Sequence, residues 1–271
     1  MSAAVTSVDA TTGGVQISWV APNNGQDTIT SYTIQIANSG STTWTASASC
    51  DGTSSTVILA LKCIVPMSTL TAAPYNLAFD ALVQVRIAAT NTFGTSTWST
   101  TNTAGARIRR IPDIMAAPTI SAYSDTSITI SWTPLAAPNN GNSDILSYSL
   151  KWNNGDGSAP SIELTNVLTT SYVVSGITAG TAYKFSVRAR NIYGYSSAES
   201  PVTTANAVNP PGKMDIPTVA LDGTTPTSVD ITWTVPTLTH GSAVDAYDVQ
   251  FKTASGTYVN DASCNPAAAS A

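Results

Sequence analysis

A short pattern that ends in tryptophan occurs three times in this chain, and it restricts the possible folds more than any other feature. The copies occupy residues 15–19 (VQISW), 128–132 (ITISW) and 229–233 (VDITW). Apolar and polar residues alternate in each copy, which predicts a β-strand with one buried face. The copies lie about one hundred residues apart, the length of a small domain. We therefore expect a row of β-domains.

Two further units follow the tryptophans in the same order. Residues 21–25 (APNNG) recur at 137–141, and a weaker third copy, Thr-His-Gly, stands at 239–241. Asn-Gly steps favour tight turns because these residues accept positive φ angles. In the first two copies a later alternating strand runs into an Asn-x-aromatic-Gly turn, at 91–94 (NTFG) and 191–194 (NIYG).

The order of these units resembles a fibronectin type III domain, a β-sandwich of about 100 residues. The resemblance implies an all-β chain of tandem immunoglobulin-like sandwiches, two complete and a third partial. We place the first repeat at residues 1–110, the second at 111–208 and the third at 209–271. The second copy is the closest, because residues 177–183 (ITAGTAY) resemble the tyrosine corner of the family.

The first repeat departs from this pattern at the same place. Val83 stands where the corner tyrosine would be, and residues 61–83 are longer than the matching part of the second repeat. We expect this insertion to form a loop that covers one end of the sandwich. A loop of this length is sometimes functional, so a contact surface is the alternative.

The third copy stops soon after Cys264, which corresponds to Cys50 of the first repeat. A half sandwich would expose its core and its strand edges, which proteins avoid. We expect that the chain is a fragment of a longer protein. The alternative is that a neighbouring subunit supplies the missing strands.

Cys50 and Cys63 are predicted to form a disulfide. They flank an Asp-Gly turn and the strand expected after it, within one repeat. A disulfide implies an oxidising, extracellular or cell-surface setting. Two buried free thiols in a cytosolic protein are the alternative; a metal site is disfavoured because two cysteines and the distant His240 do not supply four ligands. Cys264 is then unpaired within this chain, and by analogy it would pair with a cysteine beyond residue 271.

Composition excludes several functions. The net charge is −5 and only 10% of the residues are charged, which argues against nucleic acid and against anionic membrane surfaces as partners. No apolar stretch is long enough to insert into a membrane. A single histidine, scattered aspartates and two glutamates in separate strands provide no catalytic set, no metal site and no cofactor-binding motif.

Three arginines before the first linker, Arg107, Arg109 and Arg110, are the candidate contact residues. They could bind an acidic partner; the alternatives are solvation and a brace between two domains. Trp44 and Trp98 are expected at the surface, either stacked on sugars or packed on strands. All of these interpretations stay open.

The sequence therefore predicts a non-enzymatic, extracellular structural protein that forms or decorates a filament or spacer through contacts between domains. Its expected partners are other copies of itself or neighbouring repeats, and possibly another structural protein. The alternatives are an adhesion or receptor module, and accessory domains of a larger secreted enzyme. Fibronectin type III domains occur in all three settings, so the fold alone does not decide.

Overall fold

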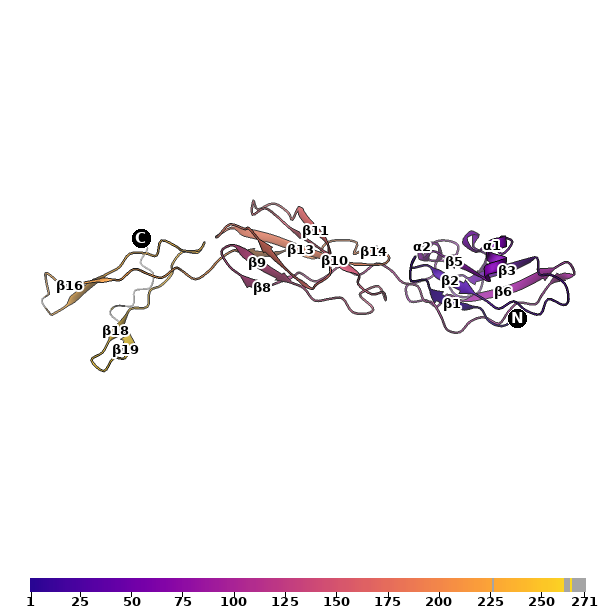
Figure 1. The fold of residues 1–271 in the computed structure, drawn as a ribbon, viewed down its shortest axis with the longest axis horizontal. Coiled ribbons are helices and arrows are strands. Elements are labelled where there is room, and N and C mark those ends of the chain that lie inside the picture. Colours follow the sequence, from indigo (N-terminus) through magenta and orange to yellow (C-terminus); the bar gives the residue numbers. More distant parts are fainter. Residues whose placement is uncertain (226, 261–263, 265–271) are drawn as a thin grey trace. The chain divides into compact units, whose positions relative to one another are not determined.

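The computed structural model describes residues 1–225, 227–260 and 264, and its described residues are mainly β-strands (Figure 1). The chain divides into two compact units. The first unit joins Met1–Met115 with Pro134–Tyr148 and Arg188–Glu199; the second holds the other described residues. Turns of the second repeat thus pack with the first repeat. None of the helices in the described chain has the length and apolar character needed to cross a bilayer.

The first repeat consists of two antiparallel sheets and the helices that connect them. The strands of one sheet, in spatial order, are β1 (Val5–Val8), β2 (Val15–Ser18) and β5 (Lys62–Val65). Those of the other are β4 (Trp44–Thr45), β3 (Ser31–Ala37), β6 (Val85–Asn91) and β7 (Gly94–Thr95). The helical segments are the 3₁₀ turn η1 (Ala48–Cys50), α1 (Ser55–Ala60) and α2 (Met67–Thr71).

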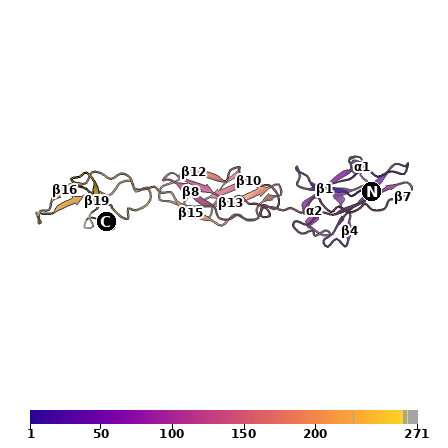
Figure 2. The ribbon, with the colours of Figure 1, turned by 90° about the horizontal axis from the view of Figure 1, so that it is seen from below.

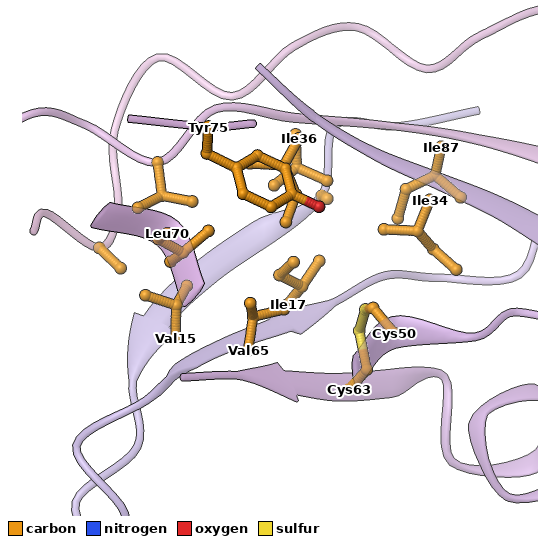
Figure 3. Close-up of a cluster of buried hydrophobic side chains, with 14 of the residues drawn as sticks. Val15, Ile17, Ile34, Ile36, Cys50, Cys63, Val65, Leu70, Tyr75 and Ile87 are labelled. Atoms are coloured by element: carbon orange, nitrogen blue, oxygen red, sulfur yellow. A yellow bond between two sulfur atoms is a disulfide. The ribbon is translucent and has the colours of Figure 1, made fainter. Parts of the chain in front are cut away.

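The inward faces of the two sheets form the core that the alternation predicts. Val15, Ile17, Ile34, Ile36 and Ile87 are at most 2% exposed. Figure 3 shows these side chains in one cluster, with the disulfide that joins Cys50 and Cys63 at its edge. Cys63 faces the core because it pairs with Ile17 across β2 and β5.

The expectation of a strand directly after the Asp-Gly turn is wrong. Residues 55–60 form α1, and the strand that pairs with β2 is β5, inside the segment expected to be a loop. The disulfide and the β2 pairing hold Lys62–Val65 as the edge strand. Residues 55–60 therefore lie outside the sheet, where they form a helix that lays Val57 and Ile58 on the core.

The rest of the insertion packs on the sandwich, as expected. Met67 and Leu70 of α2 are buried in the core cluster, and so are Tyr75 and Leu77 beyond it. The hydroxyl of Tyr75 donates a hydrogen bond to the carbonyl of Ala46 (2.7 Å). The insertion thus contributes apolar side chains to the first repeat.

The chain after β7 closes the outer edge of β6 with side chains. The backbone amides of Ala89, Ile87 and Val85 donate to the side-chain oxygens of Ser96, Ser99 and Asn102. These acceptors are three residues apart, whereas the amides on the strand are two apart. The amides of Ser96 and Ser99 also donate to the carbonyls of Ala89 and Ile87 (both 2.8 Å), so side chains and backbone together close this edge.

The second repeat also has two sheets, and Figure 2 labels strands of both. The strands of one sheet, in spatial order, are β12 (Ser171–Ser175), β9 (Ser127–Ser131) and β8 (Thr119–Tyr123). The other sheet runs β11 (Ile162–Val167), β10 (Ser147–Trp152), β13 (Ala182–Asn191) and β14 (Gly194–Tyr195), and β15 (Thr203–Asn206) also pairs with β13.

The tyrosine corner is present in the second repeat. The hydroxyl oxygen of Tyr183 accepts a hydrogen bond from the backbone amide of Thr178 (3.0 Å). In the first repeat Val83 takes this place, fully buried, and its amide donates to the carbonyl of Ala106 (2.9 Å). The two repeats therefore stabilise this crossing by different contacts.

The described residues of the third repeat form two separate strand pairs. They are β16 (Thr218–Leu221) with β17 (Val229–Thr232), and β18 (Gln250–Lys252) with β19 (Tyr258–Asn260). Trp233 and Tyr247 stack with ring centroids 5.4 Å apart, while Leu221 and Val219 are 74% and 64% exposed. This repeat is a partial sandwich, in which apolar residues of the strand faces are exposed.

Candidate functional site: the contact surfaces at the ends of the repeats

Two of the three candidate arginines make contacts within the first unit. Arg107 donates from Nη1 to the carbonyl oxygen of Asp80 (2.7 Å), and its guanidinium lies 3.6 Å from the carboxylate of that residue. Arg110 lies 2.5 Å from the carboxylate of Asp113 and stacks over the ring of Phe79. Both ion pairs are exposed, so each contributes little to stability.

Arg109 differs from its two neighbours. In the part of the chain that the structure describes, its side chain has no hydrogen bond or ion pair. It lines two hollows of about 610 Å³ and 490 Å³. The second hollow also contains Tyr193, whose pKa is raised by burial, while the positive charge of Arg109 acts in the opposite direction.

Tyr193 makes the most specific contact of this surface. Its hydroxyl donates to the carbonyl oxygen of Gly13 (2.9 Å), and its ring packs against the core of the first repeat. Gly13 has a φ of +72°, and a Cβ there would lie 2.9 Å from the tyrosine ring. A side chain at this position is therefore excluded both by the backbone conformation and by the ring.

The backbone of Arg110 completes the contact. Its carbonyl oxygen accepts from the side-chain amide of Asn191 (2.8 Å), which also donates to the carbonyl of Asn140 (3.0 Å). The amide of Arg110 donates to the carbonyl of Gly141 (3.2 Å), and a Cβ on Gly141 would overlap the carbonyl oxygen of Arg110. We call the surface formed by Gly13, Arg110, Asn191, Gly141 and Tyr193 the first joint.

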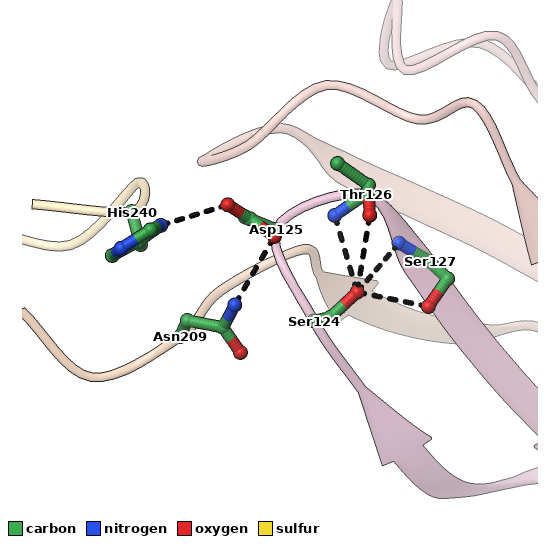
Figure 4. A network of polar contacts seen from close by, with 6 residues as sticks. All are labelled: Ser124, Asp125, Thr126, Ser127, Asn209 and His240. Carbon is green, nitrogen blue, oxygen red and sulfur yellow. Dashed lines mark hydrogen bonds and ion pairs between the residues drawn. The ribbon is translucent and has the colours of Figure 1, made fainter. Parts of the chain in front are cut away.

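A second joint lies within the second unit, and Figure 4 shows its polar contacts. The Nδ1 atom of His240 lies 2.8 Å from Oδ2 of Asp125, and the side-chain amide of Asn209 donates to Oδ1 of the same carboxylate (3.1 Å). Gly180 and Gly241 approach so closely that a Cβ on either would meet the backbone of the other. The only histidine of the sequence thus has a structural partner.

Trp44 and Trp98 flank a common side chain. The guanidinium of Arg86 lies 4.6 Å from the ring centroid of Trp44 and 4.4 Å from that of Trp98. Its Nε and Nη2 atoms donate to Oε1 of Gln35 (2.9 and 2.7 Å). One side of each indole is therefore occupied from within the first repeat. This contact agrees with packing on the strands.

Sequence reasoning found the arginines but missed most of the partners. Tyr193 and Asn191 belong to the Asn-x-aromatic-Gly turn. An aromatic residue in a turn that is expected to be exposed could have indicated a contact surface. Asp125 and His240 lie far apart in the sequence, and no pattern connects them. Among the described residues, no three metal-ligating side chains come together. The groups at the two joints are therefore suited to hydrogen bonding and packing between protein surfaces.

Residues 116–206 match the fibronectin type III domain family. They are a fibronectin type III domain. The sequence units and the two-sheet sandwich of the first repeat are of the same kind, so the chain carries tandem fibronectin type III repeats, as the resemblance implied. The matched segment lies outside the insertion, which is confined to the first repeat.

Three relatives whose sequences match this chain are named as enzymes. Endoglucanase B of Cellulomonas fimi is 26% identical over 250 residues, which is 88% of this chain and 21% of the relative. Exoglucanase B of Cellulomonas fimi is 35% identical over 139 residues, 49% of this chain and 12% of the relative. Chitinase A1 of Niallia circulans is 36% identical over 100 residues, 35% of this chain and 14% of the relative. The chain spans about a fifth or less of their length.

Proposed function

We propose that this chain is a non-catalytic spacer of an extracellular protein, in which fibronectin type III repeats keep their neighbours at fixed separations through direct contacts. One observation carries the proposal: the Tyr193 hydroxyl bonds to the Gly13 carbonyl while its ring rests on the core of the first repeat. A freely jointed row of domains needs no such contact. A spacer does, because loose joints would let the ends approach one another.

The extracellular setting is supported by two observations. The disulfide of the first repeat is of the kind that persists in oxidising compartments. The matching relatives include endoglucanase and chitinase sequences, and polymeric cellulose and chitin lie outside the cell. We further propose that the chain belongs to a filament or lies on a cell surface.

The relatives favour a second candidate function, that of an accessory region in a secreted polysaccharide-degrading enzyme. A match of 88% of this chain to 21% of Endoglucanase B suggests such a setting. In that setting the chain would separate a catalytic domain from another domain. The joints would serve the same mechanical role, so the two candidates differ in what flanks the repeats.

Small-angle X-ray scattering tests the spacer function. We expect the scattering of the unmodified chain to fit a single conformation, and that of Tyr193→Ala to require several conformations because the first joint is freed. Phe93→Ala is the matched control, because Phe93 occupies the equivalent turn position in the first repeat and is 88% exposed. An unmodified chain that already requires several conformations, with no effect of Tyr193→Ala, would contradict the proposal.

Sedimentation with insoluble cellulose and chitin separates a spacer from a binding module. A spacer stays in the supernatant with both polymers. Retention on one polymer, abolished by substitution of Trp98, would assign a sugar-binding role to the first repeat instead. Trp98 is 40% exposed, so its indole is accessible to a sugar.

A further inference from the structure

The strand β12 forms one edge of the three-stranded sheet of the second repeat. It pairs with β9, and no other described strand lies beside it in the sheet. The amide of Trp132 donates to the carbonyl of Thr170 (2.9 Å), and this bond sets the alternation along β12. Backbone groups of alternate residues point to opposite edges of a strand. Those of Ser171, Val173 and Ser175 therefore point away from β9.

The amides at this open edge are available for pairing. None of the three has a hydrogen-bond acceptor among the described residues. The carbonyl of Ser171 accepts from the hydroxyl of Thr169 (2.7 Å), and a carbonyl oxygen can accept a second bond. All three residues are exposed, Val173 to 52%. Such a row of donors and acceptors is a template for another strand.

The corresponding edge of the first repeat is protected. That edge is β5, which pairs with β2 as β12 pairs with β9. The amide of Trp19 donates to the carbonyl of Leu61 (3.1 Å), so positions 62, 64 and 66 point away from β2. Lys62 is charged and Pro66 has no amide, and both features oppose pairing with another strand. β12 has neither feature.

Two other edge strands of the second repeat also carry obstacles. The register of β8 is irregular between Ile120 and Ala122. β11 contains the charged Glu163, and its backbone is interrupted at Asn166, which has a φ of +59°. Bulges, charges and breaks of this kind keep edge strands from pairing. Five consecutive residues of β12 lack all of them.

The residues at the open edge are arranged symmetrically. Ser171 and Ser175 stand two positions before and after Val173. An antiparallel copy centred on Val173 would place serine opposite serine and valine opposite valine, and each pair would exchange two backbone hydrogen bonds. On the core-facing side, Tyr172 would lie opposite Val174 of the other copy, and pairs of an aromatic and a β-branched residue stabilise sheets. The strand thus fits a second copy of itself.

Charge does not oppose this contact. The chain has a net charge of −5, so two copies repel each other at long range. Residues 164–183, however, contain no charged side chain. The open edge can therefore approach its copy without placing like charges opposite one another, which would destabilise the pairing.

We propose that β12 pairs with β12 of a second copy of this chain, antiparallel and centred on Val173, so that two sheets join into one. The same surface is used by both copies, so the contact closes at the dimer and does not add a third copy. The inference goes beyond the spacer function and requires neither joint. One strand offers a small contact area, so we expect a weak dimer that forms at high protein concentration.

Cysteine trapping tests the register. In a Cys264→Ser background, Val173→Cys should give a disulfide-linked dimer under mild oxidation, because the Cα atoms of this opposed pair would lie about 5.5 Å apart, within the range of a disulfide. The matched control is Ser175→Cys, on the same face of the same strand. Its thiol would lie four residues, or roughly 14 Å, from its counterpart. Equal rates of dimer formation by the two variants would overturn the proposal.

Sedimentation equilibrium gives an independent measurement. The weight-average mass of the unmodified chain should rise with concentration and level off at twice 27.9 kDa. Val173→Lys should abolish the rise, because it places two ammonium groups opposite each other. Val173→Thr, which is also β-branched but uncharged, should keep it. Since Val173 is exposed, both variants should fold, and their melting temperatures check this.

Two outcomes of this measurement would refute the pairing. One is a mass that stays at 27.9 kDa at every concentration, and the other is a rise that Val173→Lys leaves unchanged. The spacer function fails separately, because it is tested by scattering of Tyr193→Ala. A loose first joint refutes the spacer function, whereas the absence of a dimer refutes only the contact between copies.

Discussion

The imidazole of His240 and the carboxylate of Asp125 lie 2.8 Å apart, although 114 residues separate them in the sequence and each belongs to a different repeat. Asn209 holds the other carboxylate oxygen. The backbone supports the contact, because the amide of Asn209 donates to the carbonyl of His240 (3.4 Å) and that of Gly212 to Leu238 (2.8 Å). The second joint thus combines side-chain and backbone bonds.

We predict that Asp125 and His240 are energetically coupled. A double-mutant cycle with Asp125→Asn and His240→Asn should give a coupling energy of roughly 0.5–1 kcal/mol, typical of a partly exposed pair. Asparagine suits position 240 because it tolerates the positive φ of +47° there. The measurement is hydrogen exchange at the amide of Asn209. Additive effects of the two substitutions would show that the pair contributes nothing.

The disulfide should stabilise the first repeat alone. Replacing Cys50 and Cys63 by alanine is expected to lower its free energy of unfolding by roughly 3 kcal/mol in the loop-entropy account. Urea unfolding followed by tryptophan fluorescence measures the loss, and the second repeat, which has no cysteine, serves as internal reference. An unchanged first repeat would mean that the bridge is dispensable for folding.

Arg86 should stabilise the first repeat through the planar shape of its guanidinium as well as through its charge. Arg86→Ala is expected to destabilise the first repeat by about 1–2 kcal/mol, because the guanidinium is held between Trp44 and Trp98. Arg86→Lys should recover only part of the loss, since an ammonium group cannot stack in the same way. Near-ultraviolet circular dichroism of the indoles reports the stack. Full recovery with lysine would show that charge alone is sufficient.

The corner tyrosine allows a prediction with a close control. Tyr183→Phe removes the acceptor of the Thr178 amide and should cost the second repeat about 0.5–1.5 kcal/mol, the usual net contribution of a hydrogen bond, because this bond is only partly buried. Tyr172→Phe changes an equivalent atom on a residue that is 37% exposed, and it should be nearly neutral. Equal effects of the two substitutions in thermal unfolding would argue against the corner bond.

Stability should fall at acidic pH for a specific reason. Hydrogen bonds from Thr92 lower the pKa of Asp27 below its ordinary 3.8, and hydrogen bonds from Thr53 do the same for Asp51. The folded pKa is the lower one, so these groups stabilise the fold above 3.8 and lose the effect as pH falls through their folded pKa. Melting temperatures recorded below about pH 5 should drop, and less steeply in Asp51→Asn than in Asp245→Asn.

Much of the fold could be predicted from the sequence, because alternation fixes which side chains face inward. Val85, Ile87 and Ala89 are buried as the pattern indicates. The helix at Ser55–Ala60 could not be predicted this way. Its β-branched residues favour a strand locally, and only the pairing of Cys63 with Ile17 excludes it from the sheet.

The contact residues were harder to predict for a related reason. A polar contact such as that of Asp125 with His240 depends on where the ends of two sandwiches meet, and neither residue type signals this by itself. The arginine cluster could be found in the sequence. At the first joint, however, Arg110 accepts a hydrogen bond through its backbone carbonyl and not through its side chain. A carbonyl group is common to every residue, so composition and spacing do not mark it.

The side chains that close the edge of β6 affect how these molecules behave when crowded. The side chains of Ser96, Ser99 and Asn102 accept from the amides of β6 that face its outer edge, so these donors are not available for pairing with another strand. Edge-to-edge growth of the sheet, the usual route to amyloid-like aggregation, is thereby blocked on this side. At high protein concentration, neighbouring copies are therefore not expected to extend their sheets through the outer edge of β6.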